Sequence, residues 1–379
     1  MNLDEVRVKI NDINDQMLAL FKERMELSKD VAAAKKEMNK AIYDAKRERD
    51  ILDKVTRDAG PDLDLYARRF FEALFSLSRT YQSEQLFQDN EFTIKMKKAI
   101  EQSPTLPPQR GSVACAGVFG SNAQMACDKL LPLSQIHYVT GFRAVFDAVE
   151  SGECQFGVLP IENSSNGSVK EVYDLLEERK CYIVRGTRLW ISHDLLMKKG
   201  TKLEDIHTII SHPQALGQCS HFLDTLEGVE LRSFDNTARA AQMVSASDDP
   251  GVAAIAAPQC ADLYNLSPLM RNIQNSDNNY TRFICISKDF HVYPGANKIS
   301  VVTTASHAPG GLGTLLTKFA NIGVNLTKLE SRPIVGHNFE FLFYLDLEAS
   351  LADPKVLSVL AELHTSQDKF RLLGNYPEN

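Results

Sequence analysis

The sequence predicts a multi-domain chain with an all-α N-terminal segment, an α/β middle segment and an α+β C-terminal segment. Residues 6–35 carry apolar side chains at alternating spacings of four and three, typical of a long helix packed against partner helices. After a proline-rich stretch at residues 103–112, short apolar runs alternate with helical segments, which favours an open α/β sheet. The last segment follows the order β-α-β-β-α-β. We therefore place the domains at residues 1–102, 112–292 and 297–379.

The composition excludes several classes of protein. With 379 residues and 44% hydrophobic side chains, the chain can bury more than one core. Its net charge of -7 and the lack of a basic stripe argue against a general affinity for nucleic acid or anionic membranes. The N-terminus is a charged amphipathic helix and no run of about 18 apolar residues occurs, so we expect a cytoplasmic protein. Seven dispersed cysteines and nine histidines lack ligand spacings, and no glycine-rich loop has nucleotide spacing, so we expect reduced thiols, no metal and no cofactor.

The expected N-terminal helix has a cation inside its apolar stripe. Arg24 occupies a stripe position, where burial without an anion would be costly. Lys35 lies on the same face, about 16 Å further along the axis, whereas Arg7 points about 100° away. Arg7 and Arg24 of one chain therefore cannot easily reach one pocket, and if they serve a single site, one of them comes from a second chain. The apolar members of the stripe are Val6, Ile10, Ile13, Met17, Leu20, Leu27, Val31 and Ala34.

Two further helices carry polar groups at inward positions. After a turn at residues 39–42 we expect a helix over residues 44–57, and a third helix that starts at Asp62 and runs towards residue 100. The polar groups are Asp44, Arg47 and Glu48 on the second helix, and Ser78 and Gln82 on the third. Polar groups on all these helices favour a buried anionic ligand. The alternative is a helical dimer in which a polar residue only sets the register.

Residues 1 to about 90 resemble the small all-helical chorismate mutases, which are intertwined dimers of three-helix chains. The resemblance implies that chorismate rearranges to prephenate without a nucleophile, metal or cofactor, and that Arg7 crosses from the second subunit. The family's site pattern is met at Arg7, Arg24, Lys35, Asp44, Arg47, Glu48, Ser78 and Gln82.

The same resemblance implies a role for each of these residues. Arg7, Arg24 and Arg47 bind the two carboxylates of chorismate in forked, charge-assisted pairs. Lys35 and Gln82 donate to the ether oxygen, where negative charge grows as the C–O bond breaks. The remaining members accept from the ring hydroxyl or orient substrate and cations, and they are Glu48, Asp44 and Ser78.

In the middle segment, polar loops adjoin the apolar runs that we expect to be strands. The loops lie at residues 160–168, 211–218 and 278–283, where an open α/β sheet holds ligands. The second loop leads directly into a helix, whose N-terminus suits an anion. The runs are residues 113–116, 156–160, 181–184, 208–210, 252–256 and 282–286.

Residues from about 112 to 292 resemble prephenate dehydratase, through the motifs P-I-E-N at 160–163, S-H-P-Q at 211–214 and T-R-F at 281–283. The resemblance implies two α/β lobes that close on a cleft, as in periplasmic binding proteins, and loss of carboxylate and ring hydroxyl from prephenate to give phenylpyruvate. It makes Thr281 the catalytic residue, as a positioned donor or relay. It carries over as substrate-binding or supporting residues Glu162, Asn163, Ser211, His212, Gln214, Gln218, Thr237 and Arg282.

Several of these positions fit a structural role equally well. Arg282 suits a substrate carboxylate or a structural contact, His212 suits bracing of its loop, and Gln214 suits capping of the helix. The family's G-P-x-G-[ST]-[FY]-S loop is altered at residues 117–123, which keep Gly117, Gly120 and Ser121. Ser121 is still expected to bind prephenate, while the effect of the altered loop on the rate stays open. A module that binds a small anion without chemistry is the alternative for this segment.

The C-terminal segment resembles an ACT domain, a ferredoxin-like regulatory module that binds amino acids. We expect strands at residues 299–304, 324–329, 339–347 and 370–373, with helices at 312–321 and after Asp353-Pro354. The E-S-R-P motif is present, while the companion G-A-L-V loop reads G-G-L-G at residues 310–313. The resemblance implies that phenylalanine binds at Gly310, Gly311, Leu312, Glu330, Ser331, Arg332 and Pro333. A plain glycine-rich turn before a helix is the alternative for the altered loop.

Together the three segments resemble the bifunctional P-protein family of phenylalanine biosynthesis. The resemblance implies chorismate and prephenate as substrates, L-phenylalanine as feedback effector and a homodimer. Whether dimers pair into tetramers, and whether prephenate passes between sites without release, stays open. The rival interpretations are an active mutase with an impaired dehydratase, and a small-anion or amino-acid sensor that kept the folds without catalysis.

Overall fold

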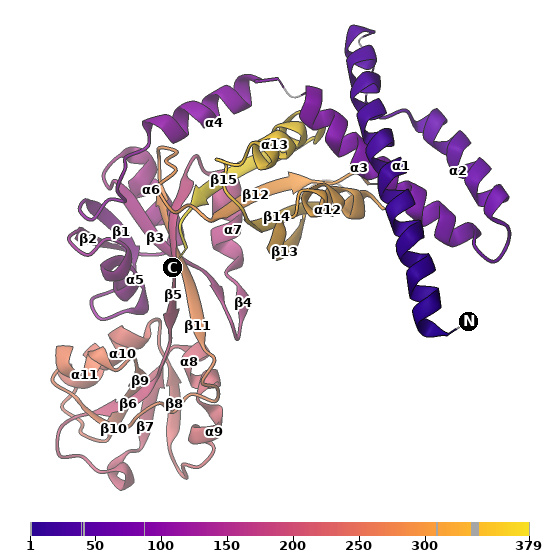
Figure 1. Ribbon diagram of the computed structural model, residues 1–379. Helices are drawn as coiled ribbons and strands as arrows, with labels where there is room; N and C mark the ends of the chain where they lie inside the picture. The colour runs from indigo at the N-terminus through magenta and orange to yellow at the C-terminus, as the bar shows by residue number, and fades with distance from the viewer. Residues whose placement is uncertain are drawn as a thin grey trace. The chain divides into compact units, whose positions relative to one another are not determined.

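The computed structural model describes residues 2–38, 40, 42–86, 88–307, 310–334 and 341–378. The chain divides into two compact units, one formed by residues 1–98 with 303–370 and the other by residues 99–302 with 371–379. Figure 1 traces the elements of both units along the chain. Within the described ranges, none of the helices is long and apolar enough to cross a membrane.

The N-terminal helices begin at side-chain caps. The first is α1 (Leu3–Glu37), where the Asn2 side chain accepts from the Glu5 N–H while the Glu5 carboxylate accepts from the Asn2 N–H. The second is α2 (Ala45–Ala59), which is capped by the Asp44 carboxylate. Helix α3 (Asp64–Leu86) packs along both α1 and α2. Residues 39 and 41 of the expected turn lie outside the described residues.

The expectation of one continuous third helix is wrong, because α3 ends at Leu86 and a new helix, α4, spans Glu91–Gln102. The restart has a local cause in Asn90 and Thr93. Asn90 Oδ1 accepts from the Thr93 N–H at 2.9 Å, and Thr93 Oγ1 accepts from the Asn90 N–H at 2.8 Å. These reciprocal bonds satisfy backbone donors at the start of α4, so the sequence favours a new helix start there.

The apolar stripe of α1 is exposed within one chain. Ile13, Leu20 and Leu27 are 53%, 65% and 57% exposed, whereas the buried positions of this helix are Ser28 and Ala32. Helix α3 contacts Arg24 within the stripe but leaves these three apolar side chains uncovered.

The C-terminal elements follow the order that the sequence predicts. They are β12 (Lys298–Thr304), α12 (Gly311–Asn321), β13 (Asn325–Pro333), β14 (Phe341–Glu348), α13 (Pro354–Ser366) and β15 (Phe370–Tyr376). The strands form a sheet in the order β13-β14-β12-β15, with β13 and β14 antiparallel. Residues 339–340 of the strand expected at 339–347 lie outside the described residues.

The second unit contains two lobes, each built on a mixed sheet. The first sheet has the order β2-β1-β3-β11-β5, with β4 paired to β3, and the second has the order β10-β6-β9-β7-β8. The first lobe comprises β1 (Ser112–Ala116), α5 (Asn122–Leu130), β2 (Gln135–Val139), α6 (Phe142–Ser151), β3 (Phe156–Asn163), β4 (Gly167–Ser168), α7 (Lys170–Glu178), β5 (Tyr182–Trp190) and β11 (Tyr280–Ser287). The second comprises β6 (Asp194–Met197), a 3-10 helix (Leu203–Asp205), β7 (Thr208–Ser211), α8 (Pro213–Gln218), α9 (Ser220–Leu223), β8 (Glu230–Ser233), α10 (Thr237–Ala246), β9 (Val252–Ala256), α11 (Gln259–Leu263) and β10 (Ser267–Met270). Each of the six apolar runs overlaps one of these strands, which confirms that prediction.

The chain crosses between the lobes twice, at residues 191–193 and 271–279. The two crossing segments bond to each other, because the Ile191 N–H donates to Asn279 O at 2.7 Å and the Ile273 N–H donates to His193 O at 2.9 Å. Figure 1 shows β5 and β11, which are paired antiparallel, leading from the first lobe to these crossings. Polar side chains at the crossings are thus placed between the ends of two buried sheets.

Candidate functional site

Polar residues of α1 and α3 meet inside the helical domain. The Arg24 guanidinium donates through Nη1 to Ser78 Oγ, and its Cζ lies 5.7 Å from the centre of the Phe75 ring. Ser78 and Gln82 are both buried. Burial lowers the pKa of Arg24, and the negative charge of Glu48 opposes this shift. The arrangement is a partly desolvated cation beside uncharged hydrogen-bonding groups.

Gln82 and Lys35 are the other predicted donors of the helical domain. The amide oxygen of Gln82 is buried and has no hydrogen-bond partner among the described residues. An unsatisfied buried acceptor is costly, so this oxygen is suited to a ligand group that donates a hydrogen bond. Lys35 Nζ donates to Ile42 O, which places its ammonium at the connection between α1 and α2.

Glu48 forms an ion pair with Arg79, a residue that the sequence did not single out. Arg79 also lies over the Tyr43 ring, 5.3 Å from its centre. An arginine on the polar side of an amphipathic helix is as compatible with exposure to solvent as with a role in a site. The sequence therefore gave no signal that marked Arg79.

Three of the predicted residues are exposed in a single chain. Arg7 is 65% exposed and pairs with Asp4 at 3.2 Å. It precedes Arg24 by seventeen residues on one continuous helix, which separates the two by about 25 Å along the axis. Asp44 and Arg47 are exposed, and the Asp44 carboxylate accepts from the Arg47 backbone N–H at 3.0 Å as the cap of α2.

In the second unit, Asn163 and Thr281 are in direct contact. Asn163 ends β3, and its Oδ1 accepts from the backbone N–H groups of Ser165 and Asn166, each at 3.0 Å. Its Nδ2 donates to Thr281 Oγ1 and to Asn279 Oδ1, both at 2.9 Å. Because Thr281 accepts in this contact, the hydrogen of its hydroxyl is left to donate to another group.

The contacts continue to Gln218 and His193. Asn279 Nδ2 donates to Gln218 Oε1 at 3.3 Å, and His193 Nε2 lies 3.0 Å from the same oxygen. The His193 backbone N–H donates to Gln274 Oε1 at 3.0 Å. Sequence reasoning found Gln218 and Asn163 but missed His193 and Gln274. Each of the missed residues is a lone polar side chain in a crossing segment, without a motif around it.

The S-H-P-Q loop has mainly structural contacts. Ser211 is fully buried and donates through Oγ to Ile255 O at 2.6 Å, which joins β7 to the neighbouring β9. His212 is the N-cap of α8, since its Nδ1 accepts from the Gln214 N–H at 3.2 Å. The cap is therefore His212, and the exposed Gln214 side chain does not supply it. Thr237 is the first residue of α10.

Arg282 has structural partners. Its side chain is 6% exposed, its Nη2 donates to the Tyr376 hydroxyl at 2.7 Å, and its Nε bonds to the Glu378 carboxylate. Glu162, the other predicted residue nearby, lies 3.8 Å from Arg282 Nη1. Of the two options that the sequence left open for Arg282, the observed contacts favour the structural one.

Glu378 is the centre of this charged group. It pairs with Arg282 and Lys298, and Arg188 Nη2 lies 3.1 Å away. Burial by itself would raise the pKa of Glu378, but the charges of Arg282 and Lys298 outweigh burial and hold the pKa below its ordinary value.

The altered loop at residues 117–123 is bound to the other lobe. Gly120 O accepts from Gln259 Nε2 at 3.1 Å, and the Tyr264 hydroxyl donates to Phe119 O at 2.7 Å. Gly120 has a φ of +86°, and a Cβ there would lie 2.9 Å from Leu263 Cδ1. Ser121 is buried and caps α5 by accepting from the Gln124 N–H at 3.4 Å.

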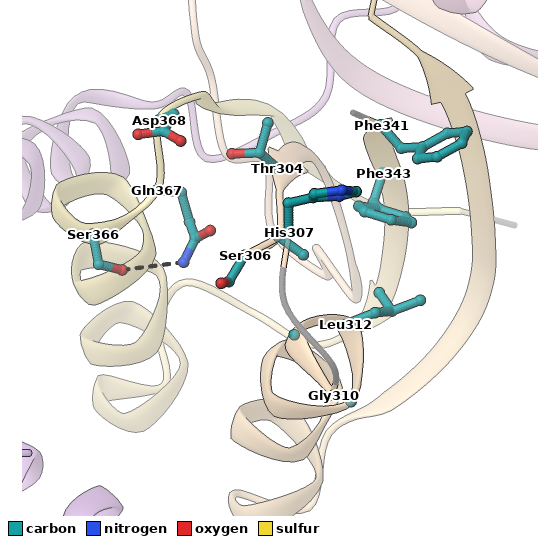
Figure 2. A pocket seen from close by; sticks show the side chains of 13 residues that line it. Thr304, Ser306, His307, Gly310, Leu312, Phe341, Phe343, Ser366, Gln367 and Asp368 are labelled. Carbon is teal, nitrogen blue, oxygen red and sulfur yellow. Dashed lines mark hydrogen bonds between the residues drawn. The ribbon is translucent and has the colours of Figure 1, made fainter. Parts of the chain in front are cut away.

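A cavity of about 690 Å³ lies at the N-terminus of α12 in the first unit, and Figure 2 shows its lining. Gly310 has a φ of +84°, and a Cβ on Gly311 would lie only 2.0 Å from Ser306 O, so both positions require glycine. The lining consists of Thr304, Ala305, Ser306, His307, Gly310, Gly311, Leu312, Gly313, Phe341, Phe343, Ser366, Gln367 and Asp368.

The E-S-R-P motif lies on β13, beside this cavity. In the register with β14, Ser331 is opposite Phe343 and Pro333 is opposite Phe341. Of the predicted phenylalanine residues, Gly310, Gly311 and Leu312 line the cavity, and Ser331 and Pro333 are cross-strand neighbours of its aromatic residues. Glu330 and Arg332 pair instead with Tyr344 and Leu342, which do not line it. Among the described residues, no group of three or more His, Cys, Asp or Glu side chains could hold a metal ion.

Comparison with known proteins identifies both catalytic segments. Residues 6–83 match the family model for chorismate mutase type II, and residues 113–291 match that for prephenate dehydratase. The bifunctional chorismate mutase/prephenate dehydratase of Escherichia coli (strain K12) is 31% identical over 382 residues, covering 98% of this chain and 95% of the relative. The chloroplastic arogenate dehydratase/prephenate dehydratase 2 of Arabidopsis thaliana is 35% identical, covering 75% of this chain and 81% of the relative. The crystal structure of a prephenate dehydratase from Arthrobacter aurescens in complex with L-Phe has 30% identity and a TM-score of 0.65, covering 70% of this chain and 89% of that one.

The fold and the two sites define a helical chorismate mutase joined to a two-lobed prephenate dehydratase. The chain belongs to the family of bifunctional chorismate mutase/prephenate dehydratases of phenylalanine biosynthesis. The predicted family and the two predicted activities are thereby confirmed.

Proposed function

We propose that residues 1–102 convert chorismate to prephenate, that residues 112–292 convert prephenate to phenylpyruvate, and that phenylalanine bound in residues 297–379 controls the flux. The observation that carries the proposal is the cluster of Arg24, Ser78 and Gln82, in which a partly buried cation lies beside buried hydrogen-bonding side chains. A dianionic substrate pairs with this cation.

The mutase reaction needs orientation and charge stabilisation. Arg24 is held by Ser78 before any substrate binds, so little freedom remains to be lost when it pairs with a carboxylate. Lys35 and the Gln82 amide are the proposed donors to the ether oxygen, and stabilisation of the charge that grows there lowers the barrier. Glu48 is the proposed acceptor for the ring hydroxyl, which requires it to exchange its bond with Arg79.

A second copy of the chain is the proposed partner of α1. The exposed stripe of Ile13, Leu20 and Leu27 needs an apolar partner. Arg7 is about 25 Å along the helix from Arg24, far beyond the reach of an arginine side chain, so Arg7 serves the site of the other subunit. Each site of the proposed homodimer is therefore incomplete without the partner chain.

The dehydratase reaction is assigned to the cluster around Thr281. The bond from the ring to its carboxylate breaks, its electron pair enters the ring, and the ring hydroxyl leaves. A proton relayed through the Thr281 hydroxyl makes the leaving group water, and solvent restores that proton. Asn163 supports this role, because it occupies a lone pair of Thr281 Oγ1 and leaves the hydroxyl hydrogen free to donate.

The cavity beside α12 is the proposed phenylalanine site of a ferredoxin-like ACT domain. Backbone N–H groups at the helix N-terminus suit the carboxylate of an amino acid, and Asp368 suits its ammonium group. Figure 2 shows Phe341, Phe343 and Leu312 around the same cavity, where an aromatic side chain can pack. The structure of the Arthrobacter relative with L-Phe supports this choice of ligand.

One assay tests the proposal. Purified protein is given chorismate, and prephenate and phenylpyruvate are followed separately, with and without millimolar phenylalanine. Formation of both products, with less phenylpyruvate when phenylalanine is present, is the expected result. No loss of chorismate would contradict the mutase assignment, and prephenate accumulating alone would contradict the dehydratase assignment. Supplying arogenate in a parallel reaction tests whether the second site also accepts the substrate named for the plant relative.

A further inference from the structure

An oriented chain of hydrogen bonds leads from Thr281 to His193. It is anchored at Asn163, where Oδ1 faces backbone N–H groups that can only donate. The Asn163 Nδ2 therefore faces Thr281 and Asn279, its two nearest acceptors, with Tyr280 O slightly further away at 3.2 Å. With its oxygen occupied in this way, Asn279 donates through Nδ2 to Gln218 Oε1.

The same orientation fixes the tautomer of His193. Its Nε2 contacts Gln218 Oε1, which already accepts from Asn279, so Nε2 carries the hydrogen and Nδ1 does not. Gln218 Nε2 and His193 Nδ1 are buried without partners among the described residues. Gln218 thus presents two N–H donors whose direction is set by the bonds to its oxygen.

The backbone of His193 is bonded to the other crossing segment, and burial favours the neutral form of its ring. Its backbone bonds to Gln274 Oε1 and to the Ile273 N–H, on the other crossing segment. Burial lowers the pKa of the ring, while its bond to Gln218 and the charge of Asp194 oppose that shift only in part. A buried neutral imidazole whose single N–H is already used has no proton to give to the substrate.

We propose that His193 is a positioning residue of the dehydratase site. It holds the Gln218 amide so that both N–H groups of Gln218 point at a substrate carboxylate. Through Gln218 and Asn279, it also keeps Asn163 in place to donate to Thr281. The proposal rests on the dehydratase function proposed above. A carboxylate only accepts, so it matches an unpartnered pair of N–H donors.

The charge of the donor also matters for the reaction. Arg282, the cation next to Thr281 in sequence, is already bound by Glu378 and Tyr376. A neutral amide stabilises a carboxylate less than an arginine does, which suits a group that leaves as carbon dioxide.

Three variants of the full chain test the role of His193. His193→Leu keeps an apolar side chain of similar size and removes the donor, whereas His193→Gln can place an amide N–H near the position of Nε2. His207→Leu is the matched control, because His207 is an exposed histidine of the same lobe that pairs with Asp249. Prephenate turnover by the unchanged protein is measured first, and it tests the proposed function separately.

We expect His193→Leu to lower the kcat for prephenate about tenfold or more, with the mutase rate unchanged. His193→Gln should recover most of the kcat, and His207→Leu should match the unchanged protein. A fully active His193→Leu would overturn the proposal. A second result would also overturn it: His193→Gln is as slow as His193→Leu and loses one limb of the pH–rate profile. That pattern would identify His193 as a general acid or base.

A measurement on the unchanged protein covers the case in which His193→Leu fails to fold. With ¹⁵N-labelled histidine, the NMR signals of His193 are assigned by their loss in His193→Gln. The expected result is a ring that carries its hydrogen on Nε2 in the neutral form and has a pKa below the ordinary histidine value. A ring whose pKa is not lowered, or that carries its hydrogen on Nδ1, would contradict the proposed orientation.

Discussion

Complementation between two impaired variants tests the placement of Arg7 in the partner's site. Arg7→Ala and Arg24→Ala each remove one cation from the proposed mutase site. A hydrogen bond to a charged group contributes roughly 1.5–3 kcal/mol, so each variant alone should lose about tenfold to a hundredfold in mutase kcat/KM. Dehydratase activity on supplied prephenate should be unchanged in both, because Arg24 and Arg7 belong to the other compact unit.

The two variants together should recover activity. In a mixed dimer, the chain with Arg7→Ala still supplies Arg24 to one site, and its partner supplies the Arg7 that this site needs. Random pairing of equal amounts makes half of the dimers mixed with one intact site each, so about one quarter of all sites should work. The mixed dimers are obtained by co-expression with two different tags, and chorismate loss is followed in the ultraviolet.

The control is a pair of variants from the same side of the site. Arg24 and Ser78 bond to each other within one chain, so mixing Arg24→Ala with Ser78→Ala leaves every site broken. Recovery in the first mixture and none in the second is the expected pattern. If the first mixture gives only the average of its two parents, Arg7 does not act across the dimer and the reasoning from helix geometry fails.

Three further predictions concern Glu378 and the cavity beside α12. Glu378→Gln leaves Arg282 and Lys298 buried without their carboxylate and should lower the free energy of unfolding by about 3 kcal/mol. Unfolding in urea is followed by the fluorescence of Trp190, the single tryptophan. The control Glu230→Gln, which breaks an exposed ion pair, should change the free energy of unfolding by less than about 0.5 kcal/mol. Equal shifts in the two variants would refute the assignment. The pKa of Glu378 is lowered in the folded protein, so its ionised form stabilises the fold above the pKa of the unfolded chain, about 4.3. This stabilisation is lost as the pH falls through the pKa of the folded protein. The unfolding curves of Glu378→Gln and of the unchanged protein should therefore approach each other at low pH. Gly311→Ala should raise the phenylalanine concentration for half inhibition about tenfold or more, because its Cβ would collide with Ser306 O. The control Gly313→Ala has open space around its Cβ and should change this concentration by less than about threefold. Unchanged inhibition in Gly311→Ala would place the effector elsewhere.

Strands whose burial is uniform are readily predicted from the sequence. The strand β9 is buried at every position, and its apolar run was found without difficulty. The edge strand β8 is exposed at every position, so no hydrophobic pattern distinguishes it from a loop. The break between α3 and α4 was missed because it depends on the reciprocal bonds of Asn90 and Thr93, which the apolar spacing does not report.

The residues of the candidate sites also differ in how much the sequence reveals about them. Asn163 and Thr281 were found through short motifs, and the structure places them in contact. His193 was missed because its role depends on Gln218, 25 residues away, and on a second crossing of the chain. The partner of Arg282 was equally hidden, since Glu378 lies 96 residues further on. Local patterns report what a residue resembles, whereas its partners depend on the tertiary fold.

The bonds of Arg282 to Tyr376 and Glu378 limit how this protein can be recombined with its relatives. A chimera joined at the linker near residue 295 would keep every dehydratase motif but exchange residues 371–378, which belong to the same compact unit as Thr281. Such a hybrid would bury Arg282 against a foreign strand end. Successful grafts of the regulatory segment should therefore transfer residues 303–370 and retain the native tail.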